Sequence, residues 1–201
     1  MTLTLSNNLV GTAGEYFVCA ELCRRGYLAL LTPKNNPLFD VVVATQDGAK
    51  TISIQVKTRS VRNKQGWKLG KDITEKKHNP ALFVVLVNLE EAGPPEFYIY
   101  EYDELAEVVD TNYKAYMAKL KRDGTKRKDV GFRWHDMSLF SHADHSRRNN
   151  WKPIEESLAQ PPLTQGVHGI ELFICSTSSS RFGQYEAIFR RILESTRCRD
   201  D

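Results

Sequence analysis

The chain has few of the features that mark secreted, membrane or cysteine-metal proteins. Its 201 residues include four cysteines, none of them in a C-x-x-C pair, which argues against a disulfide framework and favours a reducing cytoplasm. No stretch approaches the roughly 18 apolar residues of a membrane helix, and the first residues show no basic-then-apolar leader. We therefore expect a cytoplasmic protein without a membrane partner.

The net charge is also small, but the charged residues are unevenly distributed. The net charge of +3 does not by itself indicate nucleic-acid binding. Residues 57–80 and 114–133 each hold eight Lys or Arg and two acids, whereas residues 90–110 hold eight acids and no Lys or Arg. Such segregation predicts a basic surface opposite an acidic one. The alternative is that each run is an ordinary solvated face.

The most informative segment is residues 38–57, where alternating side chains predict a β-hairpin. Asp47-Gly48 suits a two-residue type I′ turn, which would pair residue i with residue 95 − i. Alternate side chains then share a face. The apolar face holds Phe39, Val41, Val43, Ile52, Ile54 and Val56, and the polar face holds Asp40, Thr51, Ser53, Gln55 and Lys57. The polar face predicts a metal and phosphate site; the alternative is an ordinary half-exposed hairpin.

A helix is predicted over residues 14–25, with Gly26 as its stop signal. Its apolar stripe of Val18, Cys19 and Leu22 extends back one turn to Glu15. A buried acid is costly unless it is paired or bound to a cation, so Glu15 is a candidate ligand. The alternative is a surface glutamate that interacts with the helix dipole.

The remaining pattern predicts a mixed α/β architecture. Residues 81–87 read as a buried central strand and residues 97–102 as another strand. Asp72 and Glu75 have capping-box spacing for a short helix. Helices are expected over 104–109, capped by Asp103, and over 111–121. The second should bury Tyr113, Tyr116, Met117 and Leu120.

The polar hairpin face carries the groups that phosphodiester hydrolysis requires. That reaction needs a cation on the phosphate, a positioned water and an offset for transition-state charge. Mg²⁺ prefers oxygen ligands, which Asp40, the Gln55 amide and the Val56 backbone carbonyl could supply. Glu15 would restore the charge that Gln55 lacks. Lys57 could orient the water or contact the phosphate.

Three motifs in this order, Gly11-x-x-Gly14-Glu15, Phe39-Asp40 and Gln55-Val56-Lys57, resemble the PD-(D/E)XK nuclease superfamily. The similarity is greatest to its Mrr-like and Holliday-junction-resolvase-like members. Asn149-Asn150-Trp151 also resembles the ending of small bacterial proteins of that superfamily. The resemblance covers roughly residues 8–155.

This resemblance implies a restriction-endonuclease-like mixed sheet flanked by helices and a metal-dependent endonuclease acting on DNA. It implies Asp40, Gln55 and Glu15 as ligands of Mg²⁺ or Mn²⁺, Lys57 as the catalytic lysine, and no small-molecule cofactor. The departure is Gln55, which stands where most members have an acid. The alternative is therefore a catalytically degenerate relative that binds nucleic acid or a partner without cleavage.

A basic segment continues directly from this site, with one tryptophan among its cations. Its predicted nucleic-acid-binding residues are Thr58, Arg59, Arg62, Lys64, Trp67, Lys68 and Lys71. This composition suits a phosphate backbone with occasional base stacking. The alternative is a solvated loop anchored by Trp67. Cutting both strands of a duplex would require two sites, so we expect a homodimer.

We expect a nuclease-like domain over residues 1–157, a linker over 158–168 and a strand-helix extension over 169–201. The extension could dock, mediate dimerisation, be unrelated, or carry the function itself. Its Cys175 and Arg181 have the C-x5-R spacing of a phosphatase loop, but no histidine precedes the cysteine. His142 and His145 lack further metal ligands nearby, which favours a polar loop.

Overall fold

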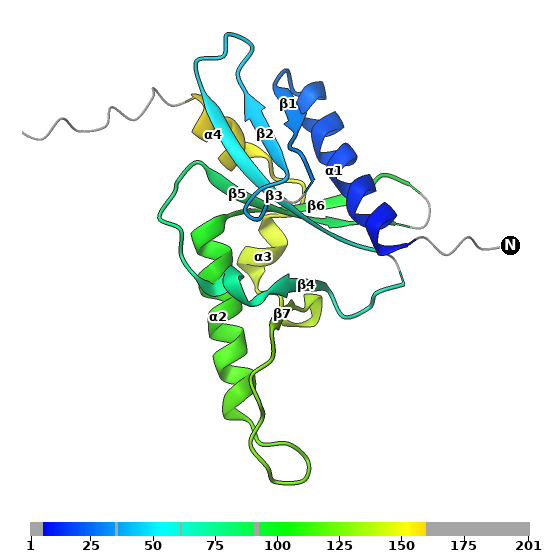
Figure 1. Cartoon of the computed structure of the whole chain (residues 1–201), viewed down its shortest axis with the longest axis vertical. Helices are drawn as coiled ribbons and strands as arrows, with labels where there is room; N and C mark the ends of the chain where they lie inside the picture. Colours follow the sequence, from blue (N-terminus) through cyan, green and yellow to red (C-terminus); the bar gives the residue numbers. More distant parts are fainter. Residues whose placement is uncertain (1–5, 35, 61, 91–92, 160–201) are drawn as a thin grey trace, which may run out of the picture. The chain divides into compact units, whose positions relative to one another are not determined.

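A five-stranded mixed sheet lies at the centre of the computed structural model, in the order β1-β2-β3-β5-β6 (Figure 1). The structure describes residues 6–34, 36–60, 62–90 and 93–159, all within one compact unit that spans residues 1–163. The strands are β1 Leu28–Leu31, β2 Val41–Ala44, β3 Thr51–Arg59, β5 Leu82–Asn88 and β6 Glu96–Glu101. β3 and β5 run parallel, and the other neighbours are antiparallel. The predicted mixed α/β sheet flanked by helices is confirmed.

The helices and a second, two-stranded sheet surround this central sheet. The elements are α1 Asn7–Arg24, η1 Lys71–Thr74, α2 Tyr102–Ala118, η2 Met137–Leu139, α3 His142–Ser146 and α4 Lys152–Ala159. β4 Trp67–Gly70 pairs with β7 Phe132–His135 in the second sheet. None of the described helices is long and apolar enough to cross a membrane.

Each face of the central sheet has its own hydrophobic core, because successive strand residues point to opposite faces. The first core joins α1 and α4 to one face through Val18, Leu22, Val41, Ile54, Val56, Val85, Ile99 and Ile154. The second core joins α2, η1 and β4 to the other face through Trp67, Leu69, Ile73, Val84, Leu86, Tyr100, Leu105 and Val109. β5 is buried along its whole length, as predicted.

The register of the 38–57 hairpin is as predicted, but its turn is different. The ladder pairs Val41 with Ile54 and Ala44 with Thr51, so paired residue numbers add to 95. The Thr45 N–H donates to the Lys50 carbonyl, which leaves a four-residue loop, and within the described residues Gly48 but not Asp47 has positive φ. A type I′ turn is therefore wrong. Two- and four-residue loops centred on the same peptide bond give the same register.

The helix boundaries differ from those expected. α1 begins at Asn7 behind a Ser6 cap, about two turns before residue 14. Residues 104–109 and 111–118 form the single helix α2, whose side chains are buried only as far as Val109. Tyr116 and Leu120 are 51% and 59% exposed, so the prediction that they face a core is wrong.

Three short strands, β1, β4 and β7, were not predicted. The short helix expected near Asp72 is present as the 3-10 helix η1. Its Asp72–Glu75 capping box is wrong, because η1 is capped at Gly70 without a side-chain hydrogen bond. Asp103 lies inside α2 and accepts the backbone N–H groups of Lys77 and His78.

The Asn149-Asn150-Trp151 segment attaches the end of the described chain to β6. The Phe97 N–H donates to Asn149 Oδ1 at 2.9 Å, and Trp151 packs against the Phe97 ring in the first core. α4 then runs to Ala159. The rest of the expected linker and the 169–201 extension, with Cys175 and Arg181, lies outside the described residues.

Candidate functional site

The candidate site lies where β3 extends beyond the end of β2. β2 covers β3 only as far as the Val41–Ile54 pair, while β3 continues to Arg59. Beyond that pair, the Val56 N–H donates to Asp40 Oδ2 at 2.7 Å, and the Asp40 N–H donates to the Ile54 carbonyl at 2.8 Å. The Asp40 side chain therefore occupies the edge of β3 in place of a partner strand.

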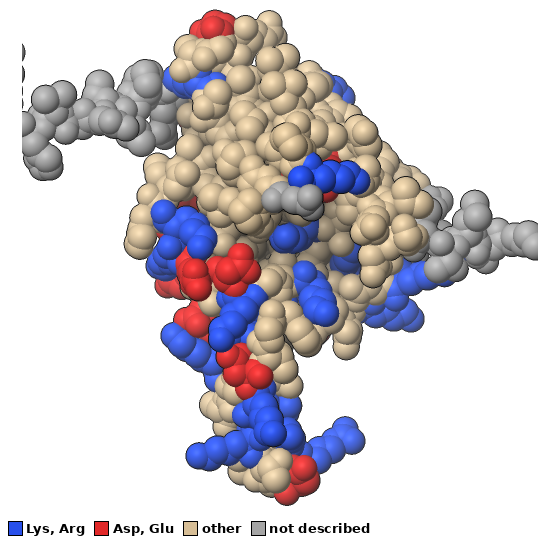
Figure 2. Space-filling model, in the orientation of Figure 1, with Lys and Arg blue, Asp and Glu red and all other residues tan. Residues whose placement is uncertain are grey.

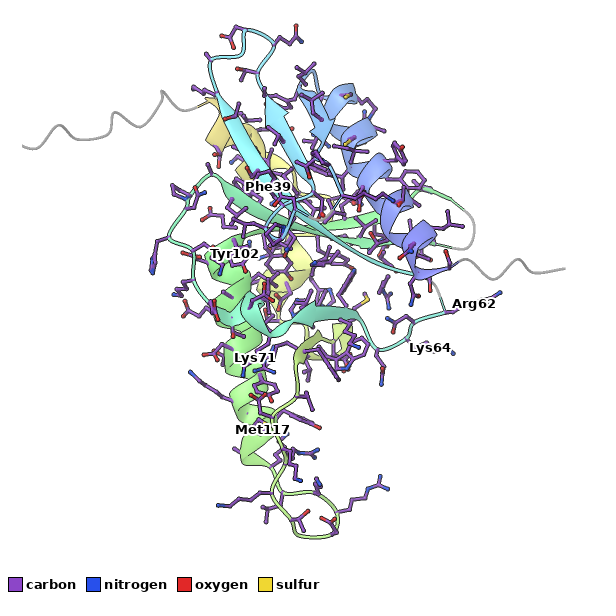
Figure 3. The ribbon with its side chains drawn as sticks, viewed as in Figure 1. Phe39, Arg62, Lys64, Lys71, Tyr102 and Met117 are labelled. Atoms are coloured by element: carbon purple, nitrogen blue, oxygen red, sulfur yellow. The ribbon has the colours of Figure 1, made fainter. Side chains whose placement is uncertain are left out.

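The chain changes direction at Asp40, which corrects the predicted position of Phe39. Leu38 and Phe39 pack against the second core, whereas Val41 belongs to the first. Figure 3 shows Phe39 on the loop that precedes β2. The Thr32 hydroxyl donates to the Phe39 carbonyl at 3.1 Å, which ties this loop to the end of β1. Phe39 is therefore not on the face of Val41 and Ile54, as alternation alone predicted.

Helix α1 brings Glu15 to this edge by crossing β3 closely at Gly14. A Cβ added at Gly14 would overlap Thr58 Oγ1 and lie 2.9 Å from Thr58 Cβ and Cγ2. Only glycine therefore permits this approach. A Cβ at Gly11 would meet nothing within 4 Å, so the two glycines of the motif differ in their structural role.

Glu15 and Asp40 line one cavity of about 380 Å³ between α1 and the loop that follows β1. The other lining residues are Asn7, Asn8, Gly11, Thr12, Thr32, Pro33 and Lys34. Burial and, next, the negative charge of Asp40 raise the pKa of Glu15, while Lys34 and Lys57 act in the opposite direction. The two carboxylates are thus close enough to repel each other, and two lysines partly offset that repulsion.

Gln55 and Lys57 lie on the second-core face of β3, on either side of Val56. Gln55 is 7% exposed, and its amide makes no hydrogen bond within the described part of the chain. Lys57 is half-buried and has no ion pair among those residues. Neither lines the Glu15–Asp40 cavity. The structure thus brings Asp40 and Glu15 together directly, and connects them to Gln55 and Lys57 through β3.

The oxygen donors at this edge fit a hard divalent cation. Two carboxylates come within electrostatic range, and the Asp40 charge raises the Glu15 pKa, a repulsion that a cation would relieve. In a strand, the N–H and C=O of one residue point to the same side. Because the Val56 N–H donates to Asp40, the Val56 carbonyl is directed to the same edge. The described residues contain no group of three His, Cys, Asp or Glu that could hold a metal, so water and neutral oxygens would complete the shell.

Lys34 is a site residue that the sequence did not indicate. It is exposed, lines the cavity, and lies with Nζ 3.5 Å from Thr12 Oγ1. Its charge lowers the pKa of Glu15. Thr32 to Pro37 read only as a connecting loop, and no periodicity marked one of its residues as inward-facing.

Two of the predicted nucleic-acid-binding residues are not available for that role. Trp67 is 1% exposed, and its Nε1 donates to the Val87 carbonyl at 2.9 Å, so its ring cannot stack on a base. The Thr58 hydroxyl is buried beneath α1. Arg59 lies over the Trp67 ring and donates to the Asn63 carbonyl. Thr58 and Trp67 therefore have packing roles.

Four other cations of this segment remain on the surface. Arg62, Lys64, Lys68 and Lys71 are exposed, and Figure 2 shows Lys and Arg side chains spread over β4 and the segment before it. Lys68 Nζ lies 4.4 Å from the centre of the Phe132 ring, and Lys71 pairs with Asp129 at 3.1 Å. These four exposed side chains make the surface of β4 and the segment before it basic.

A buried polar network lies elsewhere, between β6, β7 and α3. The Tyr100 hydroxyl donates to Asp144 Oδ1 at 2.9 Å and lies 3.2 Å from His135 Nε2. Burial lowers the pKa of His135 to about 4, so it is neutral at pH 7 and its Nε2–H donates to Tyr100. Asp144 also accepts the Ser141 N–H and hydroxyl. These bonds give Asp144 a structural role next to His142 and His145.

Comparison with solved structures gives low-scoring similarities to two DNA-processing enzymes. A bacterial homing endonuclease matches with a TM-score of 0.41 and 15% identity, over 75% of this chain and 93% of that chain. Hjc is a Holliday junction resolvase from the archaeal hyperthermophile Archaeoglobus fulgidus. It matches with a TM-score of 0.37 and 18% identity, over 65% of this chain and 86% of the resolvase chain. No family model and no curated protein matches the chain. At these scores, neither similarity assigns a role to any residue.

Proposed function

We propose that this protein is a metal-dependent endonuclease that hydrolyses phosphodiester bonds in DNA. The observation that carries the proposal is the convergence of Glu15 and Asp40 on one cavity, from a helix and a loop that are 25 residues apart. The Asp40–Val56 hydrogen bond joins this pair to the strand that carries Gln55 and Lys57. A carboxylate pair, strand carbonyl, amide and lysine match the chemistry of phosphodiester hydrolysis.

Asp40, Glu15, the Gln55 amide and the Val56 carbonyl are the proposed ligands of Mg²⁺ or Mn²⁺. When bound, the cation supplies Lewis-acid stabilisation of charge on the scissile phosphate. Lys57 holds the attacking water or the phosphate oxygen through its ammonium group. Val56 fixes the Asp40 carboxylate, so that this ligand is oriented before substrate arrives.

DNA is the proposed substrate because exposed cations lie on the segment that follows β3, the strand of Gln55 and Lys57. Arg62, Lys64, Lys68 and Lys71 contact the phosphate backbone, with no base stacking by Trp67. A homodimer would supply a second site for the second strand. The proposed location is the cytoplasm, where the thiols of Cys19 and Cys23 would stay reduced.

The second candidate is a protein of this fold that binds nucleic acid without cutting it. Gln55 favours this alternative, because it is neutral and 7% exposed. The site then has two carboxylates and a weaker amide ligand. Cation affinity, and not the arrangement of the site, would be the property that such a protein has lost.

Nicking of supercoiled plasmid DNA in Mg²⁺ or Mn²⁺ tests the proposal. The wild-type protein should nick, and Asp40→Asn and Lys57→Ala should each lower the rate by at least about 100-fold. Lys50→Ala, directly before the opposite end of β3, is the matched control and should retain wild-type activity. Equal rates for wild type, Asp40→Asn and Lys57→Ala would overturn the catalytic role.

Gln55→Glu separates the two candidates. If the wild type cuts, this variant should bind Mn²⁺ more tightly and keep or raise activity. If the wild type binds plasmid without cutting while Gln55→Glu cuts, the degenerate alternative is correct. A protein that neither binds nor cuts DNA in either form contradicts both.

A further inference from the structure

The second half of α2 and the segment that follows it form an arm, residues 110–131, which extends away from the central sheet (Figure 1). Val109 is the last buried residue of α2, and the helix continues to Ala118. At 1.5 Å per residue, the nine residues 110–118 carry the chain about 14 Å beyond the core. The arm then returns to the second sheet at β7.

A network of charged and aromatic groups fixes the base of this arm. Asp129 accepts a hydrogen bond from the Tyr113 hydroxyl at 2.5 Å and pairs with Lys71 at 3.1 Å and Arg133 at 3.0 Å. The Arg133 guanidinium lies 3.6 Å from the centre of the Tyr113 ring. Figure 3 shows Lys71 beside α2, above Met117. The arm is therefore connected to the same segment that supplies the basic surface of the proposed site.

The tip of the arm concentrates positive charge. Residues 119–128 contain one acid, Asp123, whose carboxylate accepts hydrogen bonds from Thr125. Six cations share this segment: Lys119, Lys121, Arg122, Lys126, Arg127 and Lys128. Among the described residues, none of the six forms an ion pair.

The arm also holds one of these cations in a defined orientation. The Arg127 guanidinium lies 4.1 Å from the centre of the exposed Tyr116 ring, and it donates to the Tyr116 hydroxyl at 2.8 Å and the Lys119 carbonyl at 3.0 Å. The Thr125 carbonyl accepts the Lys121 N–H at 2.9 Å and closes the loop. A structured projection with five excess positive charges has the chemistry of a polyanion contact.

We propose that this arm is a second contact with duplex DNA, which binds the phosphate backbone at a distance from the Glu15–Asp40 site. The identity of the polyanion rests on the proposed function. The projection of about 14 Å from the core allows the arm to follow the duplex along its axis, where phosphates repeat on each strand every 3.4 Å or so. The arm supplies affinity and position, and it reads no base sequence.

Duplex binding measured without divalent cation tests the arm independently of cleavage. In an Asp40→Asn background, Lys121, Arg122, Lys126 and Lys128 are replaced together by Gln. Log affinity falls with log salt concentration, and if three of them contact phosphates this negative slope should become shallower by about 2.7. Affinity at 0.1 M salt should fall by at least about tenfold. The probe is a duplex of about 30 base pairs in titrations at several salt concentrations.

The matched control removes the same charge elsewhere, by replacing Arg24, Lys50, Lys76 and Lys152 with Gln in the same background. Its salt slope should be within about one unit of that of the background protein. Equal affinity and slope for the arm variant and the control would overturn the proposal. So would an arm variant that changes the sedimentation of the protein but not its DNA binding, because the arm would then be a contact between protein chains. Absence of nicking by the wild type would contradict the proposed catalysis and leave this binding test unaffected.

Discussion

Replacing Gly14 by alanine tests how closely α1 must approach β3 to place Glu15. A Cβ at this position would lie 2.9 Å from Thr58 Cβ, whereas ordinary contact begins at 3.4 Å. Rotation of the Thr58 side chain could move Oγ1 and Cγ2 but not Cβ. The helix would therefore have to shift by about half an ångström.

This overpacking should lower the free energy of unfolding by about 1–3 kcal/mol. The higher helix propensity of alanine offsets up to about 1 kcal/mol of that loss. A net loss of up to about 2 kcal/mol is therefore expected for Gly14→Ala, if the offset is realised in full. Gly11→Ala is the matched control, because it lies one turn earlier in the same helix and its added Cβ meets nothing within 4 Å. It should stabilise the protein by up to about 1 kcal/mol.

Urea denaturation followed by circular dichroism gives both values, provided that the slopes of the transitions agree. Thr58→Ala combined with Gly14→Ala should recover part of the loss, because it removes two of the three conflicting atoms. Equal stability of the Gly14→Ala and Gly11→Ala proteins would refute the proposed close approach of α1 to β3.

Two further predictions follow from the titratable groups. The pKa of Glu15 is raised in the folded state, so the ionised side chain destabilises the metal-free protein at neutral pH. Glu15→Gln should therefore raise Tm without cation, and this gain should disappear below about pH 4.5. The same variant should reduce the Tm increase caused by Mn²⁺. An unchanged Mn²⁺ response would exclude Glu15 as a ligand. His135 has a folded pKa of about 4 against 6.5 when unfolded, so stability is retained above pH 6.5 and lost as pH falls towards 4, by up to about 3 kcal/mol. Urea titrations across this range should show the loss in wild type and a clearly smaller one in His135→Gln; identical profiles would contradict a buried neutral histidine.

The hairpin register could be predicted because it depends on alternation around one centre. Asp47-Gly48 marks that centre, and the apolar residues of both strands agree with it. The loop length could not be predicted, since two- and four-residue loops preserve the same pairs. Alternation also failed at Phe39, because the chain leaves the ladder at Asp40 to bind Val56.

The sequence pattern placed Glu15 on the buried side of α1, and the structure brings it to the cavity of Asp40. Lys34 was missed because its position depends on the path of an irregular loop. The burial of Trp67 was one of two alternatives. β4 pairs with β7 more than 60 residues away, and such short, distant pairs leave little local periodicity.

The central claim is that Glu15 and Asp40 share one divalent cation. Anomalous diffraction from crystals soaked in Mn²⁺ tests it most directly. We predict one peak within about 2.0–2.6 Å of a carboxylate oxygen of each residue, on the side of the Val56 carbonyl. A fully soaked crystal with no peak in this cavity, or with a peak that touches only one carboxylate, would contradict the claim.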